Sequence, residues 1–128
     1  IIFIGLDSNL YQRVAISTNS WVSHVGIAFS EKDRFGRTEW YVYESAPLRG
    51  RKVKVCDYVG RAFKGQFAVA RSQRPLSETQ KQSILKFLID HHGSVYHLGF
   101  NYQAEGYQFC SKLVHQAYAT AGIEMGKF

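Results

Sequence analysis

The chain has 128 residues, of which 45% are hydrophobic and 15% are aromatic, so it can bury a core without disulfide bonds and is not intrinsically disordered. Its formal net charge is +6, from 16 Lys and Arg against 10 Asp and Glu, which suits an anionic partner such as a phospholipid surface. Part of the basic charge is clustered in one short run, at residues 49–54, and the rest is spread along the chain. Such a run is typical of a solvated edge and does not predict specific nucleic-acid binding.

The chain opens at Ile1 without a Met, so we expect one domain over residues 1–128 that is trimmed slightly at both ends. No apolar run approaches the roughly 20 residues of a membrane span, and no signal peptide opens the chain, which favours a cytoplasmic location. The apolar residues 1–6 predict a buried strand. Asp7 or Ser8 can cap a short helix that follows and carries Leu10 and Val14.

Two alternating segments then predict an antiparallel hairpin. Residues 23–30 and 38–46 read as strands, and the polar residues 31–37 between them form the loop. If the hairpin closes symmetrically, Ser30 faces Thr38, and the same register sets His24 directly across from Glu44. A slip of one residue would place them on opposite faces, so this pairing is conditional on the register.

Two further strands are expected at residues 52–57 and 66–72. Cys56 lies on the lysine-bearing side of the first, but no base is paired with it, so we do not expect it to be a nucleophile. Two cysteines are too few for a secreted disulfide scaffold, although Cys56 and Cys110 could form one bridge.

A helix start is the clearest local signal in the chain. Ser77 and Gln80 have the spacing of a capping box, and Gly93 is expected to end the helix. The apolar face comprises Ile84, Leu85, Leu88 and Ile89. His91 and His92 fall in the last turn, and their spacing from His97 and His115 is irregular for a metal site, so no zinc is predicted.

A second helix follows a mixed segment at residues 95–102 that could be strand or loop. Its apolar face comprises Leu113, Val114, Ala117, Tyr118 and Ala121, and Gly122 is the expected stop. Cys110 lies in its first turn, where the helix dipole and unpaired N–H groups favour the thiolate. The alternative is that Cys110 is a small buried apolar residue, as most free cysteines are.

A thiol becomes a nucleophile when a base lies within hydrogen-bond reach and a third group orients that base. This chain offers Cys110 at a helix start, His24 on a strand and Glu44 on the neighbouring strand. Each has an ordinary structural reading: an edge histidine, an exposed glutamate and a core cysteine. The combination favours catalysis more than any single member does.

The ordered motifs of this chain resemble those of the circularly permuted papain-like group of the NlpC/P60 superfamily, and most closely its YiiX/YebB-like amidases and hydrolases. The motifs are Ser23-His24-Val25-Gly26-Ile27, Val42-Tyr43-Glu44-Ser45 and Phe109-Cys110-Ser111-Lys112-Leu113-Val114, with Tyr96-His97-Leu98-Gly99-Phe100 strengthening the YebB-like match. The resemblance covers nearly the whole chain. It implies an α+β, permuted papain-like fold with an antiparallel sheet or partial barrel packed against a helix that carries the catalytic Cys.

The resemblance also assigns roles by position. Cys110 would be the nucleophile, His24 the general base and acid, and Glu44 the group that orients His24. Tyr102 or Tyr107 could supply a hydroxyl to the substrate site. The chain departs from the common family pattern at Phe109, Lys112 and His97, where many members have Tyr, Glu and Asp, which leaves substrate preference open.

The expected function is therefore a thiol hydrolase of the amidase or peptidase type, acting on a small-molecule, peptide or N-acyl substrate. The alternatives are a lipid acyltransferase or lipase-like thiol enzyme at a membrane surface, and a non-catalytic binding module. No cofactor, metal or obligate protein partner is predicted.

Overall fold

A computed structural model describes residues 1–126 and divides the chain into two compact units. Unit 1 comprises residues 1–43 and 52–71, and unit 2 comprises residues 44–51 and residue 72 onward. Each unit is therefore built from two segments that are separated in the sequence. In residues 1–126 no helix is both long and apolar enough to cross a membrane.

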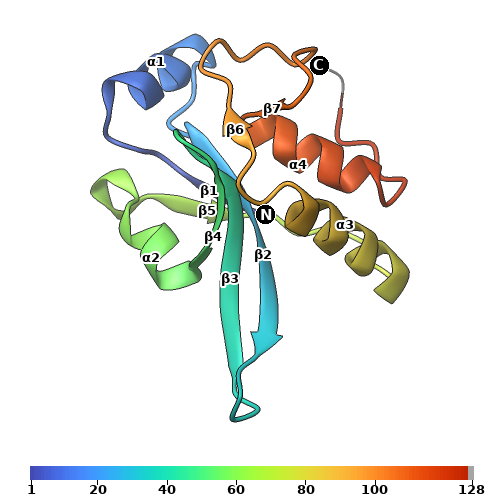
Figure 1. The fold of residues 1–128 in the computed structure, drawn as a ribbon. Coiled ribbons are helices and arrows are strands. Elements are labelled where there is room, and N and C mark those ends of the chain that lie inside the picture. The colour runs from blue at the N-terminus through green and yellow to red at the C-terminus, as the bar shows by residue number, and fades with distance from the viewer. Residues whose placement is uncertain (127–128) are drawn as a thin grey trace. The chain divides into compact units, whose positions relative to one another are not determined.

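Unit 1 holds most of a five-stranded sheet whose strand order is β4-β3-β2-β1-β5 (Figure 1). The strands are β1 (Ile2–Ile4), β2 (His24–Lys32), β3 (Thr38–Ser45), β4 (Gly50–Lys54) and β5 (Phe67–Val69). The helices are α1 (Asn9–Ser17), α2 (Val55–Gly60) and the short 3-10 helix η1 (Phe63–Gly65). The last two residues of β3 and the first two of β4 belong to unit 2.

The core of unit 1 forms around β1, the short apolar strand at the start of the chain. This strand pairs antiparallel with both β2 and β5, and its residues Ile2 and Ile4 are buried. Val42 and Tyr58 complete the core cluster, and the Tyr58 hydroxyl donates a hydrogen bond to the Ile2 carbonyl over 3.2 Å. The predicted α+β class with an antiparallel sheet is confirmed.

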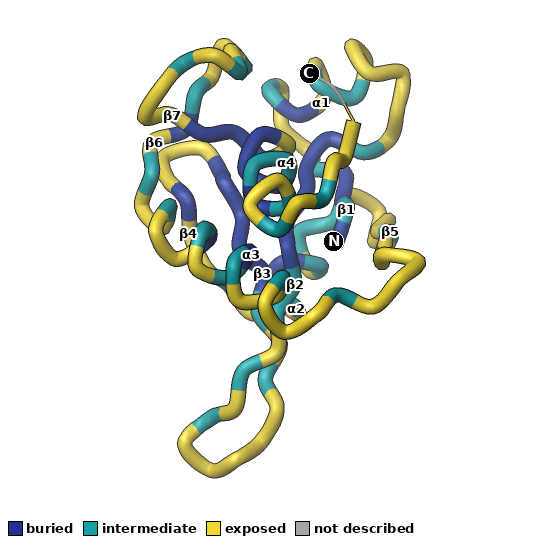
Figure 2. The backbone as a smooth tube through the Cα atoms, turned by 90° about the vertical axis from the view of Figure 1, so that its right-hand side faces the viewer, coloured by how far each residue is buried: buried dark blue, intermediate teal, exposed yellow. Residues whose placement is uncertain are grey.

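The hairpin of β2 and β3 is longer and closes more tightly than predicted. Ser30 pairs with Trp40 and not with Thr38, and the pairing continues to Lys32 with Thr38. The reason is the turn: the Asp33 carboxylate accepts hydrogen bonds from the backbone N–H groups of Phe35 and Arg37, at 2.8 and 2.9 Å. The register shift is two residues, so the same faces of the two strands still meet. The tip of the hairpin is exposed (Figure 2).

The strand predicted at residues 52–57 is wrong beyond residue 54, because β4 ends at Lys54 and α2 begins at Val55. Val55, Tyr58 and Val59 have helical spacing, and a helix brings all three to the core cluster. Over so few residues, the alternation of a strand and the spacing of a helix can begin alike, so the sequence alone favoured a strand where a helix forms. The strand predicted at residues 66–72 is confirmed only for Phe67–Val69.

Unit 2 contains α3 (Glu78–Asp90), β6 (Val95–Tyr96), β7 (Tyr107–Gln108) and α4 (Cys110–Ala119). The capping box is confirmed: the Gln80 N–H donates to Ser77 Oγ and the Ser77 N–H donates to Gln80 Oε1, over 3.2 and 3.0 Å. Helices α3 and α4 pack against each other (Figure 1). Their buried apolar residues are Ile84, Leu88, Leu113, Val114 and Ala117, whereas Ile89, predicted for this face, is 55% exposed.

Candidate active site

Cys110 is the first residue of α4, and its side chain is buried, with 6% exposure. The preceding residue, Phe109, is extended and caps the helix through its carbonyl, which accepts a hydrogen bond from the Leu113 N–H over 2.9 Å. The N–H groups of the first turn of a helix have no acceptor within the helix. The prediction that Cys110 lies in the first turn of this helix is confirmed.

Glu44 has no exposed surface, although it is a charged residue near the end of β3. Its carboxylate accepts a hydrogen bond from Arg51 Nε over 2.9 Å, and this ion pair lies within unit 2. The role of Arg51 is not apparent from the sequence alone, because the whole run at residues 49–54 has the pattern of a solvated edge. The signal that could have found it is Glu44 itself, since a buried carboxylate needs a cationic partner.

Gly50 explains why the backbone beside Arg51 is held in place. The Gly50 N–H donates to the Ser94 carbonyl and the Gly93 N–H donates to the Gly50 carbonyl, each over 2.8 Å. A Cβ atom at this position would lie 2.8 Å from the carbonyl oxygen of His91, so only glycine allows this close approach. The end of α3 thus fixes the segment that carries the Glu44–Arg51 pair.

His24 is the first residue of β2 and lies in unit 1, where it pairs with Ile4 of β1 and is 1% exposed. Its ring contacts the ring of Tyr11, with centroids 5.3 Å apart and planes at 70°. The ring of Tyr58 is a second contact: its centroid lies 5.7 Å from that of the His24 ring, and the two planes are at 31°. Two aromatic rings and a β-sheet position therefore hold the imidazole, which is not the exposed edge histidine of the ordinary reading.

The predicted register that set His24 directly across from Glu44 is wrong, because it rested on the pairing of Ser30 with Thr38. In the observed register Tyr43, the residue before Glu44, pairs with Ile27, which lies three residues after His24. Cys110 and Glu44 belong to unit 2 and His24 to unit 1. The hydrogen bonds from Cys110 to His24 and from His24 to Glu44 stay predictions.

Buried polar residues are concentrated at the three sequence motifs. The polar or charged residues buried within residues 1–126 are Ser23, His24, Glu44, Ser45, Gln108 and Lys112. Every one is a candidate catalytic residue or lies within two residues of one. Burying polar groups costs free energy unless they are paired, so such a concentration is typical of functional sites.

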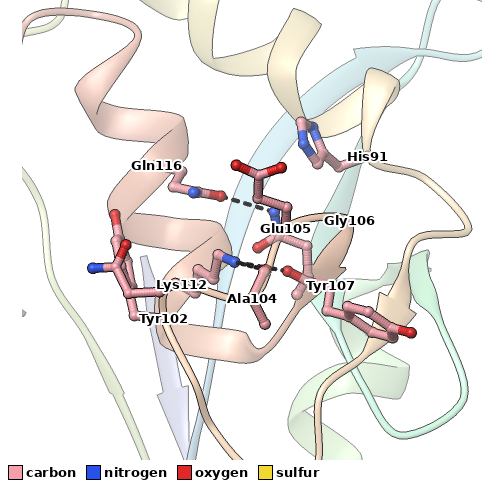
Figure 3. A pocket seen from close by; sticks show the side chains of 10 residues that line it. His91, Tyr102, Ala104, Glu105, Gly106, Tyr107, Lys112 and Gln116 are labelled. Carbon is pink, nitrogen blue, oxygen red and sulfur yellow. Dashed lines mark hydrogen bonds between the residues drawn. The ribbon is translucent and has the colours of Figure 1, made fainter.

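The two tyrosines predicted to contact substrate lie in the segment that leads into α4. The Tyr102 hydroxyl is hydrogen-bonded to His115 Nδ1 over 2.8 Å, whereas Tyr107 is 46% exposed. Both line a cavity of about 340 Å³ within unit 2, shown in Figure 3. Cys110 is not among the described residues that line this cavity, so lining the cavity does not place the two tyrosines beside the Cys110 thiol.

Both cysteines are free, so the bridge left open by the sequence is not formed. Cys56 is exposed on α2 and Cys110 is buried on α4. The burial and setting of the two thiols thus differ, which makes Cys56 a natural control for Cys110.

Comparison with known proteins identifies one family. A family model described as "Permuted papain-like amidase enzyme, YaeF/YiiX, C92 family" matches residues 1–128. Among solved structures, that of yiiX from Escherichia coli O157:H7 is similar, with a TM-score of 0.84 and 24% identity over 98% of this chain and 67% of that one. No curated protein sequence matches the chain.

The yiiX structure is described as that of a metalloprotein. Within residues 1–126 of the present chain, no group of three or more His, Cys, Asp or Glu residues is arranged to hold a metal ion. The His, Cys, Asp and Glu residues of this part of the chain therefore do not fit a metal centre.

Proposed function

Because the chain belongs to the permuted papain-like amidases of the YaeF/YiiX, C92 family, we propose that it is a cysteine hydrolase that cleaves an amide or related acyl bond through Cys110. The observation that carries this proposal is the concentration of buried polar residues at the motifs of Cys110, His24 and Glu44. A structural role for these motifs would be served by apolar residues at lower cost.

The proposed reaction has two steps. The Cys110 sulfur attacks the carbonyl carbon, and the oxyanion that forms accepts a hydrogen bond from the Cys110 N–H at the start of α4. His24 holds the thiol proton and transfers it to the leaving nitrogen, so the C–N bond breaks and a thioester remains. His24 then takes a proton from water, the hydroxide attacks the thioester, and the acid is released with the proton returned to sulfur.

Glu44 is proposed to orient the His24 ring, and Arg51 to keep Glu44 ionised. A guanidinium 2.9 Å from the carboxylate stabilises its charged form, which is the form that holds an imidazolium. This role for Arg51 is indirect, so its loss should reduce turnover less than the loss of Cys110.

The test is hydrolysis of a panel of N-acyl amino acids and chromogenic peptide amides by Cys110→Ala, with Cys56→Ala as the matched control. We expect Cys110→Ala to lower turnover by about a thousandfold or more and Cys56→Ala to leave it unchanged. Mass spectrometry of a rapidly quenched reaction should find the acyl group on the peptide that contains Cys110. Equal losses in the two variants, or an acyl group on Cys56, would contradict the assignment.

The same experiment separates hydrolysis from acyl transfer to lipid. A free acid as the product supports the hydrolase. An acylated acceptor recovered after incubation with phospholipid vesicles supports the transferase alternative.

A further inference from the structure

The cavity in unit 2 lies beside a face of α4 that the proposed reaction does not use. It is lined by one turn of α4, by the segment before β7 and by the end of α3; the lining residues that carry the argument are Glu105, Gln108, Lys112 and Gln116. With about 100° of rotation per residue, Lys112 and Gln116 lie roughly 200° and 240° around the helix from Cys110. The cavity is therefore on the other side of α4 from the candidate nucleophile.

One wall of the cavity offers a buried cation. Lys112 is 4% exposed, and its ammonium donates to the carbonyl oxygens of Ala104 and Tyr107 over 2.7 and 2.9 Å (Figure 3). Both acceptors are neutral, as is the Tyr102 ring, whose centroid lies 5.6 Å from the ammonium nitrogen, and no carboxylate within residues 1–126 forms an ion pair with Lys112. An ammonium has three N–H donors, so one hydrogen remains for an anionic group that would compensate the buried charge.

Another wall offers acceptors. Gln108 is 4% exposed; its Nε2 donates to Gln116 Oε1 over 2.8 Å, but its own Oε1 is buried and accepts no hydrogen bond from the described residues. At the rim, the exposed Glu105 carboxylate is drawn between the Gln116 amide and the His91 ring (Figure 3). A donor, and above all a cationic donor, would satisfy this side.

We propose that this cavity binds a free α-amino acid as its zwitterion. The ligand carboxylate accepts hydrogen bonds from the Lys112 ammonium and the Gln116 amide, and its ammonium faces the Glu105 carboxylate. An anion without an ammonium would be repelled by Glu105, and an amine without a carboxylate would be repelled by Lys112. The volume, about 340 Å³, is at the small end of ligand sites.

This inference goes beyond the proposed hydrolase and does not depend on it. Hydrolysis of an N-acyl amino acid would release an amino acid, but the site is separate from Cys110 and binding there forms no covalent bond. Cys110→Ala should bind amino acids as the unmodified protein does.

The test is a titration of the ¹⁵N-labelled full chain, followed through the side-chain amide resonances of Gln108 and Gln116. The probes are L-alanine, propionate and ethylamine. We expect L-alanine to bind about tenfold or more tightly than propionate or ethylamine, because each of the latter lacks one charge-assisted contact. Equal responses to L-alanine and propionate, or no response to L-alanine, would overturn the proposal.

Variants locate the binding. Glu105→Gln should weaken L-alanine binding about tenfold and leave propionate binding no weaker, whereas Glu124→Gln, an equal charge change on an exposed residue outside the cavity lining, should change neither. Lys112→Met should abolish binding of both probes. If Lys112→Met does not fold, the comparison of the two glutamate variants still decides, because equal effects of the two would contradict the site.

Discussion

Arg51 is the residue that allows Glu44 to be charged and buried at the same time. The carboxylate has no exposed surface, whereas the Arg51 side chain is 44% exposed, so one partner stays solvated and the other does not. Such an arrangement lowers the cost of burying the pair, because only the carboxylate loses its hydration fully.

We therefore predict that Arg51→Met lowers the free energy of unfolding by about 1–3 kcal/mol, a value reduced from that of fully buried pairs because the guanidinium is partly solvated. Urea denaturation measures this change. Arg49→Met, in an exposed neighbour of the same type, should change stability by less than about 0.5 kcal/mol. If the two variants are equally stable, the Glu44–Arg51 pair does not support the buried carboxylate.

Tyr43 gives the fold a defined sensitivity to alkaline pH. Burial, together with the nearby negative charge of Glu31, to which the Tyr43 hydroxyl donates over 3.2 Å, raises the pKa of Tyr43 to about 12. In the unfolded chain the phenol ionises near its ordinary value of 10.0. Between these values the unfolded state holds fewer protons than the folded state, so stability falls as the pH rises.

We predict that the free energy of unfolding is unaffected by this group below about pH 10 and decreases between about pH 10 and 12. Tyr43→Phe should show a smaller decrease over that range, measured by urea denaturation at a series of pH values. Tyr107→Phe, on an exposed tyrosine, serves as the control and should keep the original pH dependence.

At the scale of elements, Gly26 sets how closely β2 can approach β3 and α2. A Cβ atom there would overlap Val42 Cγ1 and lie 3.0 Å from the Tyr43 carbonyl oxygen. Gly60, the last residue of α2, has open space at the same position. Comparing the same substitution at the two glycines thus separates the free-energy cost of overpacking from the general effect of a Gly-to-Ala change.

Gly26→Ala should destabilise the protein by about 1–3 kcal/mol, because the added methyl group displaces core atoms. Gly60→Ala should be nearly neutral. Thermal or urea unfolding measures both, and the double variant Gly26→Ala with Val42→Ala should lose less stability than the sum of the two single losses if the clash with Val42 is the cause.

The start of α3 depends on its capping box, which satisfies two backbone N–H groups reciprocally. Ser77→Ala should cost about 1 kcal/mol of stability. Gln82→Ala, in the exposed middle of the same helix, should leave stability unchanged or slightly raised. A loss of protection against hydrogen exchange confined to the first turn of α3 would locate the effect.

The elements that were predicted correctly are those whose signals are local. The capping box of Ser77, the alternation of residues 23–30 and the helix that carries Cys110 in its first turn each depend on residues within a few positions of one another. The hairpin register failed because the side chain of Asp33, and not the strand pattern, determines where the turn closes. The strand prediction for residues 55–57 is wrong because the period of a strand cannot be distinguished from that of a helix over so short a segment.

At the scale of the whole molecule, the sequence pointed to the candidate catalytic residues but not to the polar contacts buried near them in the chain. Cys110, His24 and Glu44 were selected from motifs, and the burial of all three is observed. Arg51, Gln108 and Lys112 were missed because their roles arise from contacts with backbone carbonyls, an amide and a carboxylate that only tertiary structure brings near. A buried charge implies that it has a partner, but the sequence alone does not tell which residue that partner is.

The segment of residues 44–51 belongs to unit 2 but is encoded between the two segments of unit 1. A chain divided after residue 71 therefore separates Gly50 from Gly93 and Ser94, its hydrogen-bond partners. We predict that residues 72–128 alone show little protection against hydrogen exchange, and that adding residues 1–71 restores it. Protection of the isolated fragment equal to that of the intact chain would contradict this dependence.

The same arrangement has a consequence for biosynthesis. Glu44 and Arg51 are synthesised before any residue of the later segment of unit 2, whereas the first segment of unit 1 is by then already complete. At a synthesis rate of about 5–20 residues per second, several seconds separate the synthesis of Glu44 from that of Gly93 and Ser94, whose backbone anchors its segment. Glu44 therefore reaches its final surroundings only after the nascent chain has supplied the residues that follow α3.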